Sequence, residues 1–287
     1  MYKINLVYYW WGGENFGDYL SPFIVEKMIK GDVQIIRKRV FISNDFYYRF
    51  FKLLVRKLLR LTSEKISDYL KPGEKSLLAI GSILTYSNKN SLIWGSGFMN
   101  ENETFHGGTI LAVRGRKTNE KIIAAGGKGC TVWGDPALLL PLFILPAKEQ
   151  GKFPLGVIPH WRETSYFEEM YSDSCKVINL NTSEIEYVVR EITSCKAILS
   201  SSLHGIIVAH AYGIPAIWIK RGYIDTDGFK FADYFSSVNI DFYPGFENYD
   251  ELIRCEDSRN KLFKKNIALP NIDLYDLQQQ LIRVFPY

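Results

Sequence analysis

The sequence predicts an α/β fold made of two Rossmann-like domains that face each other across a cleft. Two observations favour this class. Short apolar segments that meet glycine turns alternate with segments of helical spacing, and the same rhythm starts again in the second half of the chain. Strands and helices that alternate in this way form parallel sheets with helices on their faces. The 287 residues are enough for two such domains with hydrophobic cores.

The first domain is assigned to residues 1–147. A helix is predicted over residues 20–29, because Ser21 is a suitable N-cap and Pro22 suits the first helical position. A second helix is predicted over residues 117–127. The strands are predicted over residues 4–10, 77–84, 91–98 and 110–115.

The second domain is assigned to residues 148–287. The boundary falls within a linker at residues 145–154, which contains two prolines, a glycine and three charges. Its last helix, residues 272–285, can pack back on the first domain. The other helices are predicted over residues 185–195 and 203–213, and the strands over residues 154–160, 175–180, 197–202 and 215–219.

Composition excludes several classes of protein. Hydrophobic residues make up 47% and charged residues 23%, which is ordinary for a globular protein and argues against disorder. The net charge of +4 is too small to indicate a nucleic-acid partner. The four cysteines show no CxxC spacing, which favours reduced thiols over disulfides or a zinc site. Without a signal-peptide pattern or an apolar run of about 20 residues, we expect a cytoplasmic protein.

One segment, residues 46–61, differs from the rest because it carries five basic residues and no acidic residue. Helical spacing places Arg49, Lys52, Arg56 and Arg60 on one face, opposite a row of aromatic and leucine side chains. Such a helix can lie on the anionic inner face of a membrane as a peripheral contact. The alternative is a solvated helix that covers the sheet.

The strongest functional signal lies in residues 198–218. A strand ends in serines, a helix starts near His204, and a Gly-Ile-Pro turn begins the next strand. The free amides and the positive dipole of that helix end form an anion site, to which Ser201 and Ser202 add hydroxyls and Gly205 adds backbone access. Because ligands bind beyond the carboxyl ends of parallel strands, His204 is predicted to donate to a phosphate or to move a proton.

Other candidates follow predicted strands in the same way. Asp18 follows a glycine-containing loop after the first strand, so it is a candidate general base, or else a turn residue. Arg114 ends a buried strand, where a contact with an anion is favoured. His160 and Arg162 follow the strand at residues 154–160 and are predicted at the cleft. No spacing of His, Cys, Asp or Glu indicates a metal site.

The chain also resembles the polysaccharide pyruvyl transferases over about residues 5–220. Each motif is weak alone, but the ordered set is specific. The set comprises Asn15-Phe16-Gly17-Asp18, Gly81-Ser82, Trp94-Gly95-Ser96-Gly97, Val113-Arg114-Gly115, Gly134-Asp135-Pro136, Ser202-Leu203-His204-Gly205 and Gly213-Ile214-Pro215.

The resemblance implies a fold similar to the glycosyltransferase-B type, with the acceptor on the first domain and the donor on the second. It implies phosphoenolpyruvate as co-substrate and no further cofactor. The implied product is a pyruvate ketal on a hexose of a capsule or exopolysaccharide unit, or of its lipid-linked precursor. Asn15 and Gly17 then line the cleft. Many members carry an arginine where this chain has Ser202. The candidates to take over its anion contact are the amides at the helix start, Ser201 and Ser202, Arg114, and the Lys220–Arg221 pair.

Two other functions stay open at this point. A glycosyltransferase that uses a nucleotide sugar could share the fold and the anion site. A non-catalytic glycan-binding homologue is a different class, and the missing arginine is the one feature that favours it. Binding of phosphoenolpyruvate, of a nucleotide sugar, or of neither distinguishes the three functions.

Overall fold

Two parallel β-sheets form the centre of the protein in the computed structural model, which describes residues 2–8, 14–29, 31–40, 46–62, 64–71, 73–222 and 226–287. The first sheet has the strand order β2-β1-β3-β4-β5, and every pair of neighbours is parallel. Its strands are β1 (Tyr2–Val7), β2 (Val33–Lys38), β3 (Ser76–Leu78), β4 (Ser91–Trp94) and β5 (Thr109–Ala112).

The second sheet repeats this arrangement with the order β7-β6-β8-β9, again with parallel neighbours. Its strands are β6 (Gly156–Ile158), β7 (Lys176–Val177), β8 (Ile198–Ser200) and β9 (Ala216–Trp218). The α/β class and the parallel sheets therefore agree with the sequence. The likeness to the glycosyltransferase-B type stays a prediction.

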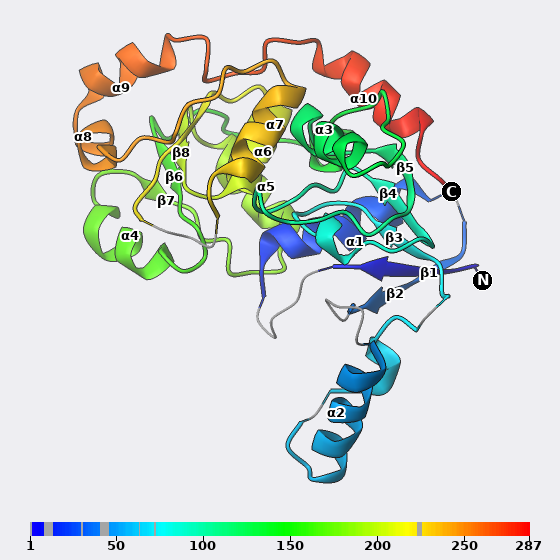
Figure 1. Cartoon of the computed structure of the whole chain (residues 1–287). Coiled ribbons are helices and arrows are strands. Elements are labelled where there is room, and N and C mark those ends of the chain that lie inside the picture. The colour runs from blue at the N-terminus through cyan, green and yellow to red at the C-terminus, as the bar shows by residue number, and fades with distance from the viewer. Residues whose placement is uncertain are drawn as a thin grey trace.

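Helices connect the strands and fill the space between the sheets (Figure 1). The α-helices are α1 (Phe16–Met28), α2 (Phe46–Leu58), α3 (Arg116–Ala124), α4 (Thr164–Tyr171), α5 (Ile185–Thr193), α6 (Leu203–Ala211), α7 (Phe229–Ser237), α8 (Tyr249–Arg254), α9 (Glu256–Phe263) and α10 (Leu274–Arg283). Short 3₁₀ helices are η1 (Ile66–Asp68), η2 (Leu84–Tyr86) and η3 (Pro136–Leu142).

The start of α1 corrects one prediction. The N-cap is Asn15, whose side chain accepts a hydrogen bond from the Gly17 amide at 2.9 Å, so the helix begins well before Ser21. Ser21 and Pro22 lie inside the helix and are buried. The earlier start matters because it places Gly17 and Asp18 in the first turn, at the carboxyl edge of the first sheet.

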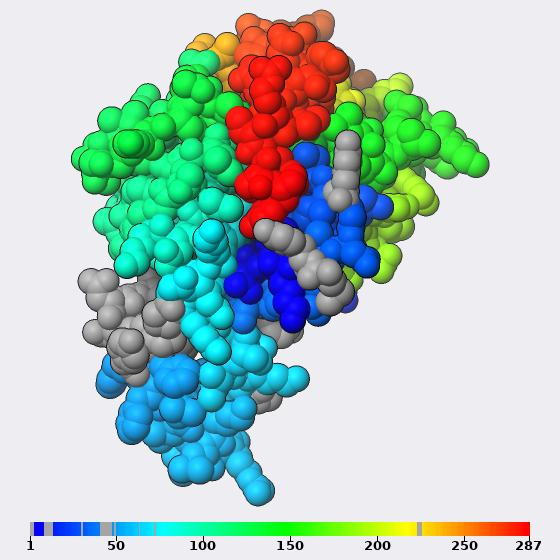
Figure 2. Space-filling view, turned by 90° about the vertical axis from the view of Figure 1, so that its right-hand side faces the viewer, coloured from blue at the N-terminus to red at the C-terminus, as the bar shows by residue number. Residues whose placement is uncertain are grey.

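One hydrophobic cluster joins the two halves. It contains Leu6 and Leu77 from the first sheet together with Val157 and Leu199 from the second. The C-terminal helix α10 packs on the first half, where the Trp94 indole donates to the Leu281 carbonyl at 2.9 Å. Figure 2 shows this C-terminal segment in red across one face of the body. The two halves therefore pack against each other over a shared core. The domain boundary near residue 147 stays a prediction.

Helix α2 is the exception, because it stands away from the body (Figure 1). Its counterpart in Figure 2 is the lobe at the lower end of the molecule. Within the described ranges, no helix combines the length and the apolar character that a bilayer crossing requires.

Candidate active site

The site begins where α1 meets α6, two helix N-termini from opposite halves of the chain. The Phe16 amide donates to the Leu180 carbonyl at 2.9 Å, which holds the start of α1 against the segment after β7. The His204 imidazole packs directly on the backbone of Gly17. A Cβ atom at Gly17 would overlap Nδ1 of that ring. Gly17 is therefore required for the close approach of the two helices.

His204 lies in the first turn of α6, as the sequence predicts. Its Nε2 atom is shielded from solvent and has no hydrogen-bond partner among the described residues. Burial, with smaller effects of the nearby positive charges of Lys230 and Arg114, lowers the pKa of the imidazole to about 3. The ring is therefore neutral at physiological pH. A buried nitrogen without a hydrogen-bond partner destabilises the folded state, so this atom is well placed to bind a ligand through a hydrogen bond.

His160 presents a second imidazole with the same properties. Its Nδ1 atom is buried and lacks a hydrogen-bond partner in the described part of the chain. Burial, followed by the charges of Lys230 and Arg162, lowers its pKa to about 3. Because the charge of Lys230 acts on both rings, His160, His204 and Lys230 belong to one site. Arg162 stacks on Trp161, with its guanidinium carbon 4.9 Å from the ring centroid.

The serines before α6 connect these loops rather than point into open space. The Ser201 hydroxyl donates to the Glu163 carboxylate at 2.5 Å and accepts from the His160 amide at 2.8 Å. Ser202 is buried and is the N-cap of α6. Ser201 therefore holds the β6–α4 loop, with His160, beside the start of α6. Sequence reasoning missed Glu163, which is also buried.

Gly205 allows α6 to lie close to the second sheet. A Cβ atom at this position would meet the Ser200 hydroxyl at 2.5 Å and the Ile158 side chain at 2.8 Å. A glycine is therefore required at this position for the helix to pack on the sheet. The close packing of α6 on the sheet fixes the position of the neighbouring residue, His204.

Asp18 occupies the third residue of α1, next to Gly17. Burial raises the pKa of its carboxyl to about 7. A carboxyl with a pKa near the working pH can both accept and return a proton, which suits a general base.

Helix α7 supplies a functional side chain that the sequence analysis did not identify. Lys230 is 7% exposed, and its ammonium lies 5.4 Å from the Phe231 ring centroid. Asp233 follows three residues later on the same helix face and is fully buried. A lysine flanked by aromatic residues, as in Gly228-Phe229-Lys230-Phe231, is the signal that could have indicated a buried cation.

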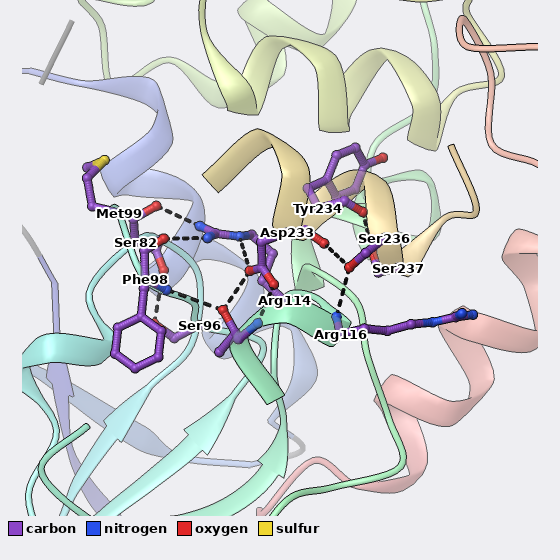
Figure 3. Close-up of polar contacts among 12 residues, drawn as sticks. Ser82, Ser96, Phe98, Met99, Arg114, Arg116, Asp233, Tyr234, Ser236 and Ser237 are labelled. Carbon is purple, nitrogen blue, oxygen red and sulfur yellow. Dashed lines mark hydrogen bonds and ion pairs between the residues drawn. The ribbon is translucent and has the colours of Figure 1, made fainter. Parts of the chain in front are cut away.

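Arg114 forms a buried ion pair with Asp233, at 2.9 Å between Nε and the carboxylate (Figure 3). Its Nη1 donates to the Ser82 hydroxyl at 2.6 Å, and its Nη2 to the Phe98 carbonyl at 2.5 Å. Thr118 donates to Asp233 from both its amide and its hydroxyl, each at 2.7 Å. The ion pair therefore joins the end of β5 and the start of α3 to α7.

This geometry changes the role expected for Arg114. The side chain is 1% exposed and bonds to three protein groups, so we assign it to the positioning of α7 rather than to direct contact with an anion. Gly97 and Gly115 belong to the same arrangement. Cβ atoms there would meet the Arg114 guanidinium and the Asp233 backbone, respectively.

The Lys220–Arg221 pair lies at a cavity whose lining includes Gly228, two residues before Lys230. Both residues line this cavity of about 630 Å³ beyond β9, together with Trp218 and Phe242. The described residues that line this cavity do not include His204 or His160. Arg221 stacks at 3.7 Å on the ring of Tyr166, and the Lys220 ammonium lies 3.4 Å from the Glu247 carboxylate.

Comparison with known proteins identifies the family. Residues 15–223 match the sequence model of the family described as polysaccharide pyruvyl transferase.

The chain belongs to the polysaccharide pyruvyl transferase family.

A relative from Acanthamoeba polyphaga mimivirus, described as an uncharacterized protein, is 30% identical over 246 residues and covers 81% of each chain. The succinoglycan biosynthesis protein ExoV of Rhizobium meliloti is 26% identical over 204 residues, which are 62% of this chain and 60% of the relative. No solved structure matches the chain. The stretch matched to the family contains His160, Arg114 and His204, whereas α7 lies beyond its end.

The ion pair that positions α7 gives a stability prediction. Asp233→Asn removes the negative charge from a fully buried pair and leaves the Arg114 charge uncompensated, so we expect a loss of about 3–5 kcal/mol in the free energy of unfolding. The matched control is Glu186→Gln in the exposed pair with Arg190, where we expect a loss below about 1 kcal/mol. Urea denaturation measures both. Equal losses in the two variants would contradict the role given to Asp233.

The raised pKa of Asp18 gives a pH-dependent prediction. The ordinary pKa of the carboxyl is 3.8 and the folded value is about 7, so the native state binds the proton more tightly than the unfolded chain. The free energy of unfolding therefore declines as pH rises between these values, and the destabilisation by the buried carboxylate is fully present above pH 7. We expect Asp18→Asn to raise Tm at pH 8 and to leave it nearly unchanged at pH 4.

The control for that experiment is Asp276→Asn. Asp276 is the third residue of α10, the same helix position as Asp18 in α1, but it is exposed. Thermal unfolding at the two pH values compares the variants. A pH-independent effect of Asp18→Asn would show that the carboxyl is not desolvated.

Proposed function

We propose that the protein transfers a pyruvyl group from phosphoenolpyruvate to two hydroxyls of a hexose in a polysaccharide or its lipid-linked precursor, with formation of a ketal and release of phosphate. Family membership supports pyruvyl transfer to a polysaccharide. The choice of donor rests on two buried imidazole nitrogens, on His160 and His204, that lack a hydrogen-bond partner among the described residues and lie near the charge of Lys230.

Phosphoenolpyruvate carries a phosphate and a carboxylate, so its site needs cationic or donor groups at two points. Lys230 supplies the positive charge. The start of α6 supplies backbone amides and the positive end of a helix dipole. A neutral His204 can donate from Nε2 to a phosphate oxygen, and His160 can do the same from Nδ1. Together these groups match a small dianion or trianion.

The reaction requires two additions of hydroxyl to the same carbon. In the first, a proton is added to the methylene carbon of phosphoenolpyruvate, and a sugar hydroxyl adds to C2 and loses its own proton. In the second, the C2–O bond to phosphate breaks, and a second hydroxyl of the sugar adds in its place. The protons of the two hydroxyls end on the new methyl group and on the phosphate, so the reaction needs no further reactant.

Asp18 and His204 are assigned to the proton transfers. The Asp18 carboxyl accepts the proton of an incoming hydroxyl, because its pKa of about 7 leaves it substantially ionised at neutral pH. His204 donates a hydrogen bond to the phosphate and stabilises the charge that develops as this group leaves. Gly17 precedes Asp18 in α1 and is packed against the His204 ring of α6, which supports the assignment of both residues to one site.

We place the acceptor sugar in the cavity beyond β9. Phe242 offers exposed aromatic surface, and the buried Trp218 Nε1 has no hydrogen-bond partner among the described residues. Aromatic faces with polar edges suit the apolar faces and hydroxyls of a sugar. Lys220 and Arg221, expected from the sequence to hold the donor, then contact the acceptor at the rim of this cavity.

The direct test measures phosphate release from phosphoenolpyruvate in the presence of saccharide acceptors, with mass spectrometry of the product. We expect His204→Ala to lower the rate by about 10²–10⁴-fold, the range typical of a lost proton-transfer group, without a change in Tm beyond that of a surface variant. The control is His106→Ala, because His106 is exposed in a loop.

Other outcomes are equally informative. Unchanged phosphate release by His204→Ala would contradict the role of this residue. Calorimetry that detects binding of a nucleotide sugar but not of phosphoenolpyruvate would replace the proposed donor. A protein that binds saccharide and neither donor would be a glycan-binding homologue.

A further inference from the structure

Helix α2 exposes a large apolar surface. Of the described side chains from residue 51 to residue 61, Leu53 is the buried one, with 4% of its surface exposed, and it marks the side that faces the body. Phe51 is 65% exposed, Leu58 84% and Leu61 64%. The sequence left open whether this helix covers the sheet. The structure shows that its apolar face points to solvent instead.

The exposed apolar side chains form one continuous face. Tyr48, Phe51, Val55 and Leu58 follow each other at steps of three and four residues, which places them in one row along the helix. Leu54 and Leu59 lie on either side of this row and are also exposed, by 40% and 59%. A contiguous exposed patch of this kind marks an interaction surface.

Exposed basic side chains lie on the remaining surface of the helix. Lys52, Arg56 and Lys57 are exposed within α2, and Arg60 is exposed immediately after it. Residues 46–61 contain no acidic side chain. The helix therefore combines an apolar row with an uncompensated positive charge.

We propose that α2 docks the protein on an anionic phospholipid surface. In this arrangement the apolar row enters the boundary between headgroups and acyl chains, and the basic residues contact the phosphates. Charge complementarity selects this occupant over a second copy of the chain. A second α2 helix offers no acidic residue to compensate the basic side chains, because residues 46–61 contain none.

The experiment is flotation of the full chain with vesicles of phosphatidylcholine alone and of phosphatidylcholine mixed with phosphatidylglycerol. We expect binding to the anionic vesicles, and we expect the binding to weaken with added salt. The triple variant Lys52→Gln, Arg56→Gln, Lys57→Gln lowers the partition coefficient by on the order of tenfold to a hundredfold. The double variant Phe51→Ser, Leu58→Ser also lowers it, through loss of apolar burial.

The matched control removes three lysines at another site, with Lys261→Gln, Lys264→Gln and Lys265→Gln at the end of α9 and just after it, where all three are exposed. This control keeps the binding of the wild type. Equal binding by all variants, or no binding of the wild type to anionic vesicles, overturns the proposal. Sedimentation equilibrium of the full chain then measures its oligomeric state. A dimer that Phe51→Ser, Leu58→Ser dissociates would identify a second copy as the occupant instead. None of these measurements depends on the transferase reaction.

Discussion

The buried ion pair between Arg114 and Asp233 is the interaction on which the arrangement of the site depends. It connects the carboxyl end of β5 to α7, two segments separated by more than a hundred residues of sequence. Asp233 shares one face of α7 with Lys230, so the pair also fixes the cation that acts on the two imidazoles. Both partners are fully buried, Arg114 donates to two further acceptors and Asp233 accepts from Thr118, so the pair has a single geometry.

Close backbone contacts bring the remaining groups together. The imidazole of His204 rests on Gly17, so the first turn of α1 and the first turn of α6 meet without an intervening side chain. Ser201 connects the His160 loop to the same helix start. As a result, two neutral imidazoles lie near the charge of Lys230, and the Asp18 carboxyl of raised pKa follows Gly17 in the first turn of α1.

The sequence predicted the parts of this arrangement that depend on local pattern. Strands that end in glycine or serine turns indicated the parallel sheets, and the same turns located His204, His160 and Asp18 at strand ends. Local pattern could not reveal residues whose roles depend on contacts between distant segments. Lys230, Asp233 and Glu163 were missed because their roles arise from contacts with distant segments rather than from their neighbours in sequence.

Two further details show the same limit. Ser21-Pro22 has the local pattern of a helix start, but the helix begins at Phe16. Asn15 caps it, and the Phe16 amide donates a hydrogen bond to the Leu180 carbonyl. Arg114 was predicted to contact an anion because a purely structural arginine is unusual at the end of a buried strand. Its partner is Asp233, a residue that the sequence offers no means of pairing with it. Helix α2 was predicted correctly as an element, and only the structure showed that its apolar face is exposed.

The central claim is that one small anionic donor is bound by both imidazoles. The most direct measurement is nitrogen NMR of the four histidine side chains during a titration with phosphoenolpyruvate. The account predicts that the His160 and His204 resonances shift together with one dissociation constant, whereas the exposed His106 and the buried His210, bonded to Tyr234 and to the Ala268 carbonyl, stay unchanged. A titration in which phosphoenolpyruvate binds and neither His160 nor His204 responds would contradict it.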